Sequence, residues 1–241
     1  MFYICMCNIV FIHQPKGELQ MGANNKVISI LKHSDHENSF SSQATDEIIK
    51  RAQARTNLFE YNCNVLENMV LPPVRDEYIT IKSSGDSKSD DEKNAWAKIV
   101  ELSDNLIKSD IWLFSLPMWN FGIPYTLKHY IDLITQQGLF FTYDENGPAG
   151  LMKNKSAILV ISSGGIYKEE PLKNYDLSTA YLKLWLGFCG ISDIFVVRVD
   201  GTAMPGFELE AILQDPSIDR AVEIISSQNY PGKAGDQAAA A

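Results

Sequence analysis

Three loops of this 241-residue chain combine side chains that could do chemistry. The first, residues 34–42, is rich in serine and stands directly before a predicted helix. Serine hydroxyls and the free N–H groups of a helix N-terminus bind phosphate without a lysine, so this loop predicts a phosphate site. Capping of the helix by the same serines is the alternative interpretation. The residues assigned to this site are Ser34, Ser39, Phe40 and Ser41.

The second loop places an amide between two aromatic rings. Asn120 can hydrogen-bond the edge of a pyrimidine-like ring, while Trp119 and Phe121 can pack against the ring itself. Aromatic packing at the end of a strand is the alternative interpretation. The residues assigned to this loop are Pro117, Met118, Trp119, Asn120 and Phe121.

The third loop contains two adjacent glycines, which let backbone N–H groups approach a flat ring closely and donate to its edge. An ordinary strand-to-helix turn is the alternative interpretation. No Gly-x-Gly-x-x-Gly motif follows the first predicted strand, which disfavours a Rossmann-type grip on a dinucleotide. The residues assigned to this loop are Ser162, Ser163, Gly164 and Gly165.

Apolar runs alternate with amphipathic segments along most of the chain. The runs predict strands over residues 27–31, 57–63, 110–116, 156–162 and 193–199. The segments predict helices over 43–54, 89–108, 123–137, 177–188 and 207–226, the last broken at Asp215–Pro216. This alternation predicts an α/β fold: a doubly wound, five-stranded parallel sheet of flavodoxin-like order 2-1-3-4-5, with helices on both faces. Ligands bind such sheets where the strand order reverses, between strands 1 and 3, and the three loops are expected to meet there.

One domain, residues 26–230, is expected between an N-terminal extension, residues 1–25, and a disordered tail, residues 231–241. The apolar stretch 1–13 is too short to span a bilayer, so no membrane partner is expected. Segment 64–91 is long and irregular for a connection in a compact domain, which indicates a functional or mobile insertion.

Charge and cysteine content exclude several functional classes. The net charge of -9 argues against a nucleic-acid partner, because a phosphate backbone needs a basic surface. The four cysteines lack the paired spacing of zinc ligands, so no metal is expected. Free thiols indicate a reducing compartment, and we expect the protein to be cytoplasmic.

A longer set of motifs resembles the family of FMN-dependent NADH:azoreductases and NAD(P)H:quinone oxidoreductases. Residues 117–132 resemble the family's P-M-[YW]-N-F…L-K-x-[YW]-[IF]-D signature. Residues 138–151 are similar to its G-x-x-F-x-Y-x-x-x-G-P-x-G-L segment, and 162–165 and 186–191 also match its pattern. Motifs of this length in this order are specific.

The resemblance is strong over residues 110–201 and weaker but colinear over 26–108. It implies a flavodoxin-like fold with bound FMN, and a homodimer with its sites at the subunit interface. It implies an enzyme that reduces quinones or azo compounds by two electrons, through ping-pong hydride transfer from NADH or NADPH. The flavin carries that chemistry, so no catalytic side chain is expected. The three loops fall on the family's phosphate, isoalloxazine and pyrimidine-edge loops.

Aromatic residues are expected to line the substrate face. Phe141 falls on an aromatic position of that face in the family, and Trp119, Tyr143 and Tyr167 are assigned with it. For Tyr143 and Tyr167, as for His129, assistance in proton transfer is one interpretation. Packing of the tyrosines and a helix-surface position for His129 are the alternative.

Two positions depart from the family pattern. Ser163 and Thr142 stand where well-known members carry arginines, which leaves the dinucleotide preference and the substrate range open. The alternative function is a flavodoxin-type one-electron carrier, or a flavin-binding module that does not oxidise NAD(P)H directly. The T-x-T-G-x-T phosphate loop of flavodoxins is absent, and a carrier needs no aromatic platform for substrate, so the enzyme is favoured.

Overall fold

Five parallel strands form the central sheet of the computed structural model, which describes residues 25–75, 78 and 89–227. The strands are β1 (Lys26–Lys32), β2 (Phe59–Val65), β3 (Ile111–Pro117), β6 (Ser156–Ser163) and β7 (Asp193–Asp200). Their order, β2-β1-β3-β6-β7, is in line with the predicted order 2-1-3-4-5, because β4 and β5 form a separate hairpin. The expected N-terminal extension, apart from residue 25, and the expected tail lie outside the described residues.

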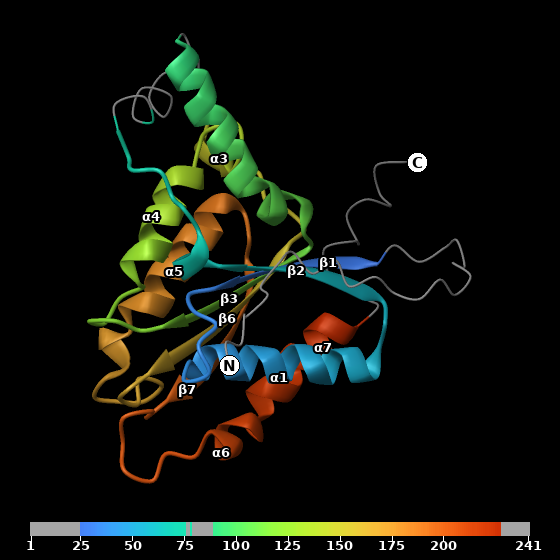
Figure 1. The fold of residues 1–241 in the computed structure, drawn as a ribbon, viewed down its shortest axis with the longest axis vertical. Coiled ribbons are helices and arrows are strands. Elements are labelled where there is room, and N and C mark those ends of the chain that lie inside the picture. The colour runs from blue at the N-terminus through green and yellow to red at the C-terminus, as the bar shows by residue number, and fades with distance from the viewer. Residues whose placement is uncertain (1–24, 76–77, 79–88, 228–241) are drawn as a thin grey trace, which may run out of the picture.

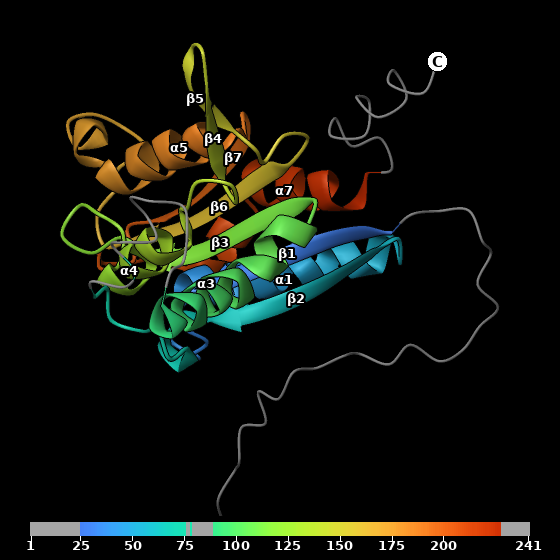
Figure 2. The ribbon, with the colours of Figure 1, turned by 90° about the horizontal axis from the view of Figure 1, so that it is seen from above.

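Helices cover both faces of the sheet (Figure 1). On one face lie α1 (Phe40–Arg55), α6 (Leu209–Leu213) and α7 (Pro216–Ser226), and on the other lie α3 (Asp90–Lys108), α4 (Tyr125–Ile134) and α5 (Leu177–Cys189). Figure 2 shows the second group of helices lying over the side-by-side strands. Among residues 25–75, 78 and 89–227, none of the helices combines the length and apolarity needed to cross a membrane.

The central strands are buried on both sides, which explains their uninterrupted apolar sequences. Trp112 and Phe114 of β3 pack in the cluster formed with α3, α4 and α5. Ile111 and Leu113, which alternate with them, pack in the cluster formed with α1 and α7. Since successive side chains of a strand point to opposite faces, one short strand contributes to both cores.

Local capping moves several helix ends away from the predicted positions. Helix α1 begins at Phe40, three residues before the predicted start at residue 43, because the Ser39 side chain accepts from the backbone N–H of Ser42. Helix α3 begins after Ser89, which forms a reciprocal capping box with Glu92. The break predicted at Asp215–Pro216 is confirmed, since Asp215 caps α7 there.

The segment after α4, whose aromatic residues were assigned to the substrate face, forms a β-hairpin of β4 (Phe141–Asp144) and β5 (Gly147–Gly150). The preceding helix ends at Ile134, before the predicted end at residue 137. The hairpin packs on the C-terminus of α5, where a Cβ added to Gly150 would lie 2.3 Å from the carbonyl carbon of Cys189. That carbonyl oxygen accepts a hydrogen bond of 2.8 Å from the Met152 N–H, which holds the two backbones together.

Gly150→Ala should therefore destabilise the protein, because the added methyl group meets backbone that cannot move independently. We expect a loss of about 1–3 kcal/mol or more in the free energy of unfolding, measured by urea denaturation. Gly187→Ala is the matched control, since a Cβ there meets nothing within 4 Å. Alanine within α5 should raise stability by about 0.5–1 kcal/mol. Equal stability of the two variants would show that the hairpin moves aside without cost.

Candidate functional site

The three loops predicted to carry chemistry meet at one edge of the sheet. They follow β1, β3 and β6, whose carboxyl ends lie side by side because the strands are parallel. Hydrogen bonds continue the pairing into the loops: the N–H of His33 donates to Ser115 O, and that of Met118 donates to Ser162 O, both at 2.7 Å. The structure thus brings the loops together where the strand order reverses.

The first loop ends at the N-terminus of α1. Ser39 caps this helix, and the Ser34 hydroxyl accepts from the His36 N–H at 3.2 Å. Ser41 is buried in the first helical turn, which contains no acidic residue. Phe40 packs edge-to-face on Phe207, with ring centroids 4.9 Å apart, so its ring belongs to the core on the α1 side.

The second loop is a tight turn in a strained conformation. Trp119 and Gly122 exchange two backbone hydrogen bonds of 3.0 Å, while Asn120 and Phe121 have φ values of 48° and 71°. Two residues with positive φ make this a turn of the I′ type, in which asparagine and glycine are favoured and phenylalanine is unusual. Strain of this kind persists where the surroundings impose it, often at ligand sites.

Aromatic contacts join the second loop to its neighbours. The Phe121 ring lies against Tyr167 and Tyr175, with centroid distances of 6.5 and 6.0 Å. The Trp119 ring meets the His33 ring edge-on at 4.6 Å. Trp119 and Phe121 remain 45% and 47% exposed, which leaves aromatic surface available to a ligand.

A hollow of about 530 Å³ adjoins this loop, a volume within the range of small-molecule sites. It lies between the loop and the first turns of α4 and α5. Of the residues assigned from sequence, Trp119 and Asn120 line it. The others lining it are Gly122, Ile123, Tyr125, Lys128, Leu177 and Tyr181.

The third loop keeps its carbonyl groups occupied and its donors open. Gly165 O accepts from Gly201 N–H at 3.0 Å, and Gly164 O accepts from Ala203 N–H at 3.2 Å. Among the described residues, no group accepts a hydrogen bond from the N–H of Gly164 or Gly165. The loop is therefore held from behind, with two backbone donors left for a ligand.

His33 is a site residue that sequence reasoning missed. Its side chain is buried at the end of β1, and Nδ1 hydrogen-bonds the Thr126 hydroxyl at 3.2 Å. Nε2 has no hydrogen-bond partner and lies 3.7 Å from a carboxylate oxygen of Glu67. Burial lowers the pKa of His33, and the Glu67 carboxylate partly opposes that change. The sequence signal that could have identified His33 is its position: a polar residue at the end of an apolar strand, next to Ser34.

Phe141 and Tyr143, two of the residues assigned to the substrate face, lie away from the three loops of their own chain. Phe141 packs against Phe188, with centroids 4.7 Å apart, and against Tyr143 at 5.7 Å. Phe188 is near the C-terminal end of α5, whereas Leu177 at its N-terminal end lines the hollow. At 1.5 Å per helical residue these ends are about 16 Å apart, so Phe141 and Tyr143 do not join the three loops of their own chain.

His129 also lies outside the site, where its Nε2 hydrogen-bonds Pro72 O at 2.8 Å. This contact joins α4 to residue 72 and involves none of the three loops. The described residues contain no group of three or more His, Cys, Asp or Glu side chains able to hold a metal ion.

The donors present at this edge fit FMN. A helix N-terminus with serine hydroxyls suits a phosphate. Exposed aromatic rings suit a flat ring system, and the open N–H groups of Gly164 and Gly165 suit an edge of hydrogen-bond acceptors.

Comparison with known proteins agrees with this arrangement. A family model described as the flavodoxin-like fold matches residues 25–217. An FMN-dependent NADH:quinone oxidoreductase of Photorhabdus laumondii is 33% identical over 181 residues, covering 75% of this chain and 89% of the relative. The chain belongs to the flavodoxin-like family of FMN-dependent NADH:quinone oxidoreductases. The resemblance inferred from the motifs at residues 117–132 and 138–151 is thereby confirmed.

Other members of this family match in sequence or in structure. The FMN-dependent NADH:quinone oxidoreductase of Beijerinckia indica is 41% identical over 122 residues, or 51% of this chain, and this chain covers 59% of that relative's length. An FMN-dependent NADH-azoreductase from Bacillus anthracis, solved in complex with FMN, superposes with a TM-score of 0.72. It is 26% identical, and the match covers 84% of this chain and 98% of the azoreductase.

The lowered pKa of His33 predicts a pH dependence of stability. Below the ordinary imidazole value of 6.5, the unfolded chain binds a proton that folded His33 resists, so acid favours unfolding. The free energy of unfolding of the flavin-free protein should fall as pH decreases from 7 toward 5. His33→Gln should reduce this slope in urea titrations.

His36→Gln is the control, because His36 is exposed and lies 4.0 Å from the same Glu67 carboxylate group. It should keep the wild-type slope. A slope unchanged in His33→Gln would mean that His33 takes up its proton without resistance in the fold.

Proposed function

We propose that this protein is an FMN-dependent NAD(P)H oxidoreductase that reduces quinones or azo compounds by two electrons in a ping-pong cycle. The observation that carries the proposal is the meeting of three complementary loops at one sheet edge: a serine-rich helix N-terminus, a strained aromatic turn and a glycine pair with open N–H groups. The names of its relatives, FMN-dependent NADH:quinone oxidoreductases, support the same reaction class.

Each loop would hold one part of FMN. Ser34, Ser39 and Ser41, with the first N–H groups of α1, would bind the phosphate. Residues 117–121 would bind the isoalloxazine ring, and residues 162–165 would bind its pyrimidine edge. When bound, FMN supplies the two-electron redox chemistry that passes reducing equivalents from NADH or NADPH to the acceptor.

The protein's own part is to position the reactants and to exclude water. Trp119 and Tyr167 offer aromatic surface against which a nicotinamide or a quinone can stack. The fixed N–H donors of Gly164 and Gly165 would stabilise the negative charge that reduction adds at the ring edge. The hydride transfers themselves require no side chain as acid or base.

The proposal includes a homodimer. Phe141 and Tyr143 are far from the loops of their own chain, so a second copy would have to bring them to a site. Exposed apolar side chains extend along α5 and onto the hairpin, among them Leu184, Phe188 and Tyr143. An apolar surface of that extent favours an interface. The proposed compartment is the cytoplasm, where a free thiol such as the buried Cys189 persists.

Asn120→Leu should weaken FMN binding by about 1–3 kcal/mol, because a polar atom of the ring would lose its partner. The dissociation constant can be measured by quenching of flavin fluorescence. Asn105→Leu is the control, since Asn105 is exposed on α3, near the opposite edge of the sheet. If both variants bind FMN as the wild type does, Asn120 does not contact the flavin.

The reaction cycle should give parallel lines in reciprocal plots at several acceptor concentrations, because one stacking place serves donor and acceptor in turn. Sizing should report about twice the chain mass of 27.0 kDa. Phe141→Ala should lower turnover more than FMN retention, since the ring would face substrate.

Anaerobic stopped-flow mixing should show rapid reduction by NADH or NADPH. A monomer that binds FMN but is not reduced by either dinucleotide would favour the one-electron carrier.

A further inference from the structure

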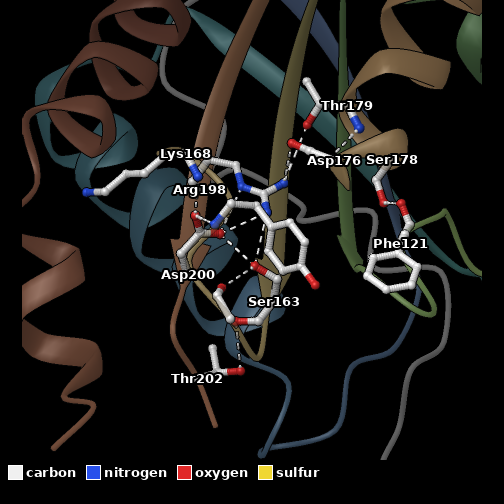
Figure 3. Close-up of polar contacts among 11 residues, drawn as sticks. Phe121, Ser163, Lys168, Asp176, Ser178, Thr179, Arg198, Asp200 and Thr202 are labelled. Atoms are coloured by element: carbon white, nitrogen blue, oxygen red, sulfur yellow. Dashed lines mark hydrogen bonds and ion pairs between the residues drawn. The ribbon is translucent and has the colours of Figure 1, made fainter. Parts of the chain in front are cut away.

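A buried cluster of charges lies directly behind the third loop (Figure 3). Arg198 of β7 forms ion pairs with Asp200, the last residue of that strand, at 2.8 Å and with Asp176, the N-cap of α5, at 3.1 Å. The three side chains are 11%, 5% and 14% exposed. Charges this well buried contribute little net stability, because each loses its hydration.

The guanidinium group joins three elements through separate hydrogen bonds. Its Nε donates to Asp200 at 2.9 Å, its Nη1 to Asp176 at 3.1 Å, and its Nη2 to the Ser163 hydroxyl at 3.0 Å. A further contact of 3.4 Å reaches the Thr179 hydroxyl in the first turn of α5. The planar fork of an arginine allows these contacts at once, which a lysine ammonium could not reproduce.

The Asp200 carboxylate in turn fixes the backbone of the loop. One of its oxygens accepts from the N–H groups of Tyr167 and Lys168 at 2.9 and 3.1 Å. The other accepts from the Ser163 hydroxyl at 2.6 Å. The loop from Ser163 to Lys168 is therefore fastened at both ends to a single carboxylate, whose position depends on Arg198.

The cluster also sets the charge behind the loop. It holds two carboxylates and one guanidinium, which leaves one negative charge uncompensated. Without Arg198 there would be two such charges in a poorly hydrated place, close to the open N–H groups of Gly164 and Gly165. Electrons added to a ring bound at those donors would then meet stronger repulsion.

We propose that Arg198 is a positioning residue that holds the loop from Ser163 to Lys168 in its FMN-binding geometry and limits the negative charge behind the flavin. This inference rests on the proposed function, since it requires bound FMN. It assigns Arg198 two separable effects. The fork geometry governs the affinity for FMN, and the charge governs how much more tightly the protein binds oxidised than reduced FMN.

The test compares three variants of the full chain with the wild type. Arg198→Gln removes charge and fork, Arg198→Lys keeps the charge, and the double variant Arg198→Gln with Asp200→Asn restores the charge balance without the fork. The dissociation constant of oxidised FMN is measured by fluorescence, and the midpoint potential of the bound flavin by dye equilibration. Arg220→Gln is the control, because Arg220 is exposed on α7 and pairs with Glu223 of the same helix.

Arg198→Gln should weaken FMN binding at least tenfold and should also lower the relative affinity for reduced FMN. A tenfold change in the ratio of the dissociation constants for oxidised and reduced FMN shifts the midpoint potential by about 30 mV for a two-electron couple. Arg198→Lys and the double variant should both bind FMN weakly but keep a midpoint potential near that of the wild type. Arg220→Gln should match the wild type in both measurements.

Separate outcomes would overturn the inference and the proposed function. A wild-type protein that binds no FMN overturns both. A wild type that binds FMN, with Arg198→Gln unchanged in affinity and potential, overturns only the role of Arg198. Weaker binding by Arg198→Gln with an unchanged potential removes the charge effect and leaves the positioning effect. If Arg198→Gln does not fold, the lysine and double variants still test the charge effect. A midpoint potential of Arg198→Lys that differs from that of the wild type contradicts it.

Discussion

Parallel pairing of β1, β3 and β6 ends three strands at the same edge of the sheet, and the candidate site depends on that alignment. The pairing is stable because β3 and β6 are covered by helices on both faces, so that their side chains serve two cores. A slip of one residue in register would turn every core side chain to the opposite face. The same packing that stabilises the fold therefore fixes where each loop begins.

Each loop is then held by a different device, and none of them needs a ligand. The first is ordered by the start of a helix and its Ser39 cap. The second closes on itself through the paired backbones of Trp119 and Gly122. The third is fastened from behind by residues 200–203 and by the charge cluster around Arg198. A site already ordered before binding loses little conformational entropy when a ligand arrives.

The strands and the chemistry of the loops were predictable from the sequence, whereas one helix start, one hairpin and one turn were not. The five strands follow from their apolar runs, and the chemistry of the loops follows from their composition. Helix α1 was predicted too short because residues 40–42, its first turn, were assigned to the loop. The hairpin at Phe141 was missed because its strands have four residues each and no clear alternation. Phe121 gave no turn signal, since glycine usually occupies its position in such a turn.

The contacts of His33 and Arg198 could not be predicted from the sequence because they join residues far apart in the chain. Arg198 reaches Ser163 only because β6 and β7 pair with Ser163 beside Asp200. His33 contacts η1 (Leu66–Asn68), Trp119 and Thr126, which come from three separate parts of the chain. Long-range contacts of this kind need the full pairing pattern of the sheet before they can be inferred.

The charge arrangement gives the site its character. The first loop, residues 34–42, contains two acidic residues and neither lysine nor arginine, in a chain whose net charge is -9. An anionic phosphate would therefore be held by oriented neutral donors and the positive end of α1, rather than by opposite charge. Oriented donors act at short range and are poorly screened by salt, whereas attraction between exposed charges is screened. Arg198 is buried behind the third loop, where it pairs with two carboxylates instead of facing the ligand. Charge in this fold thus sets the geometry of the backbone, and the backbone supplies the donors that a flavin would meet.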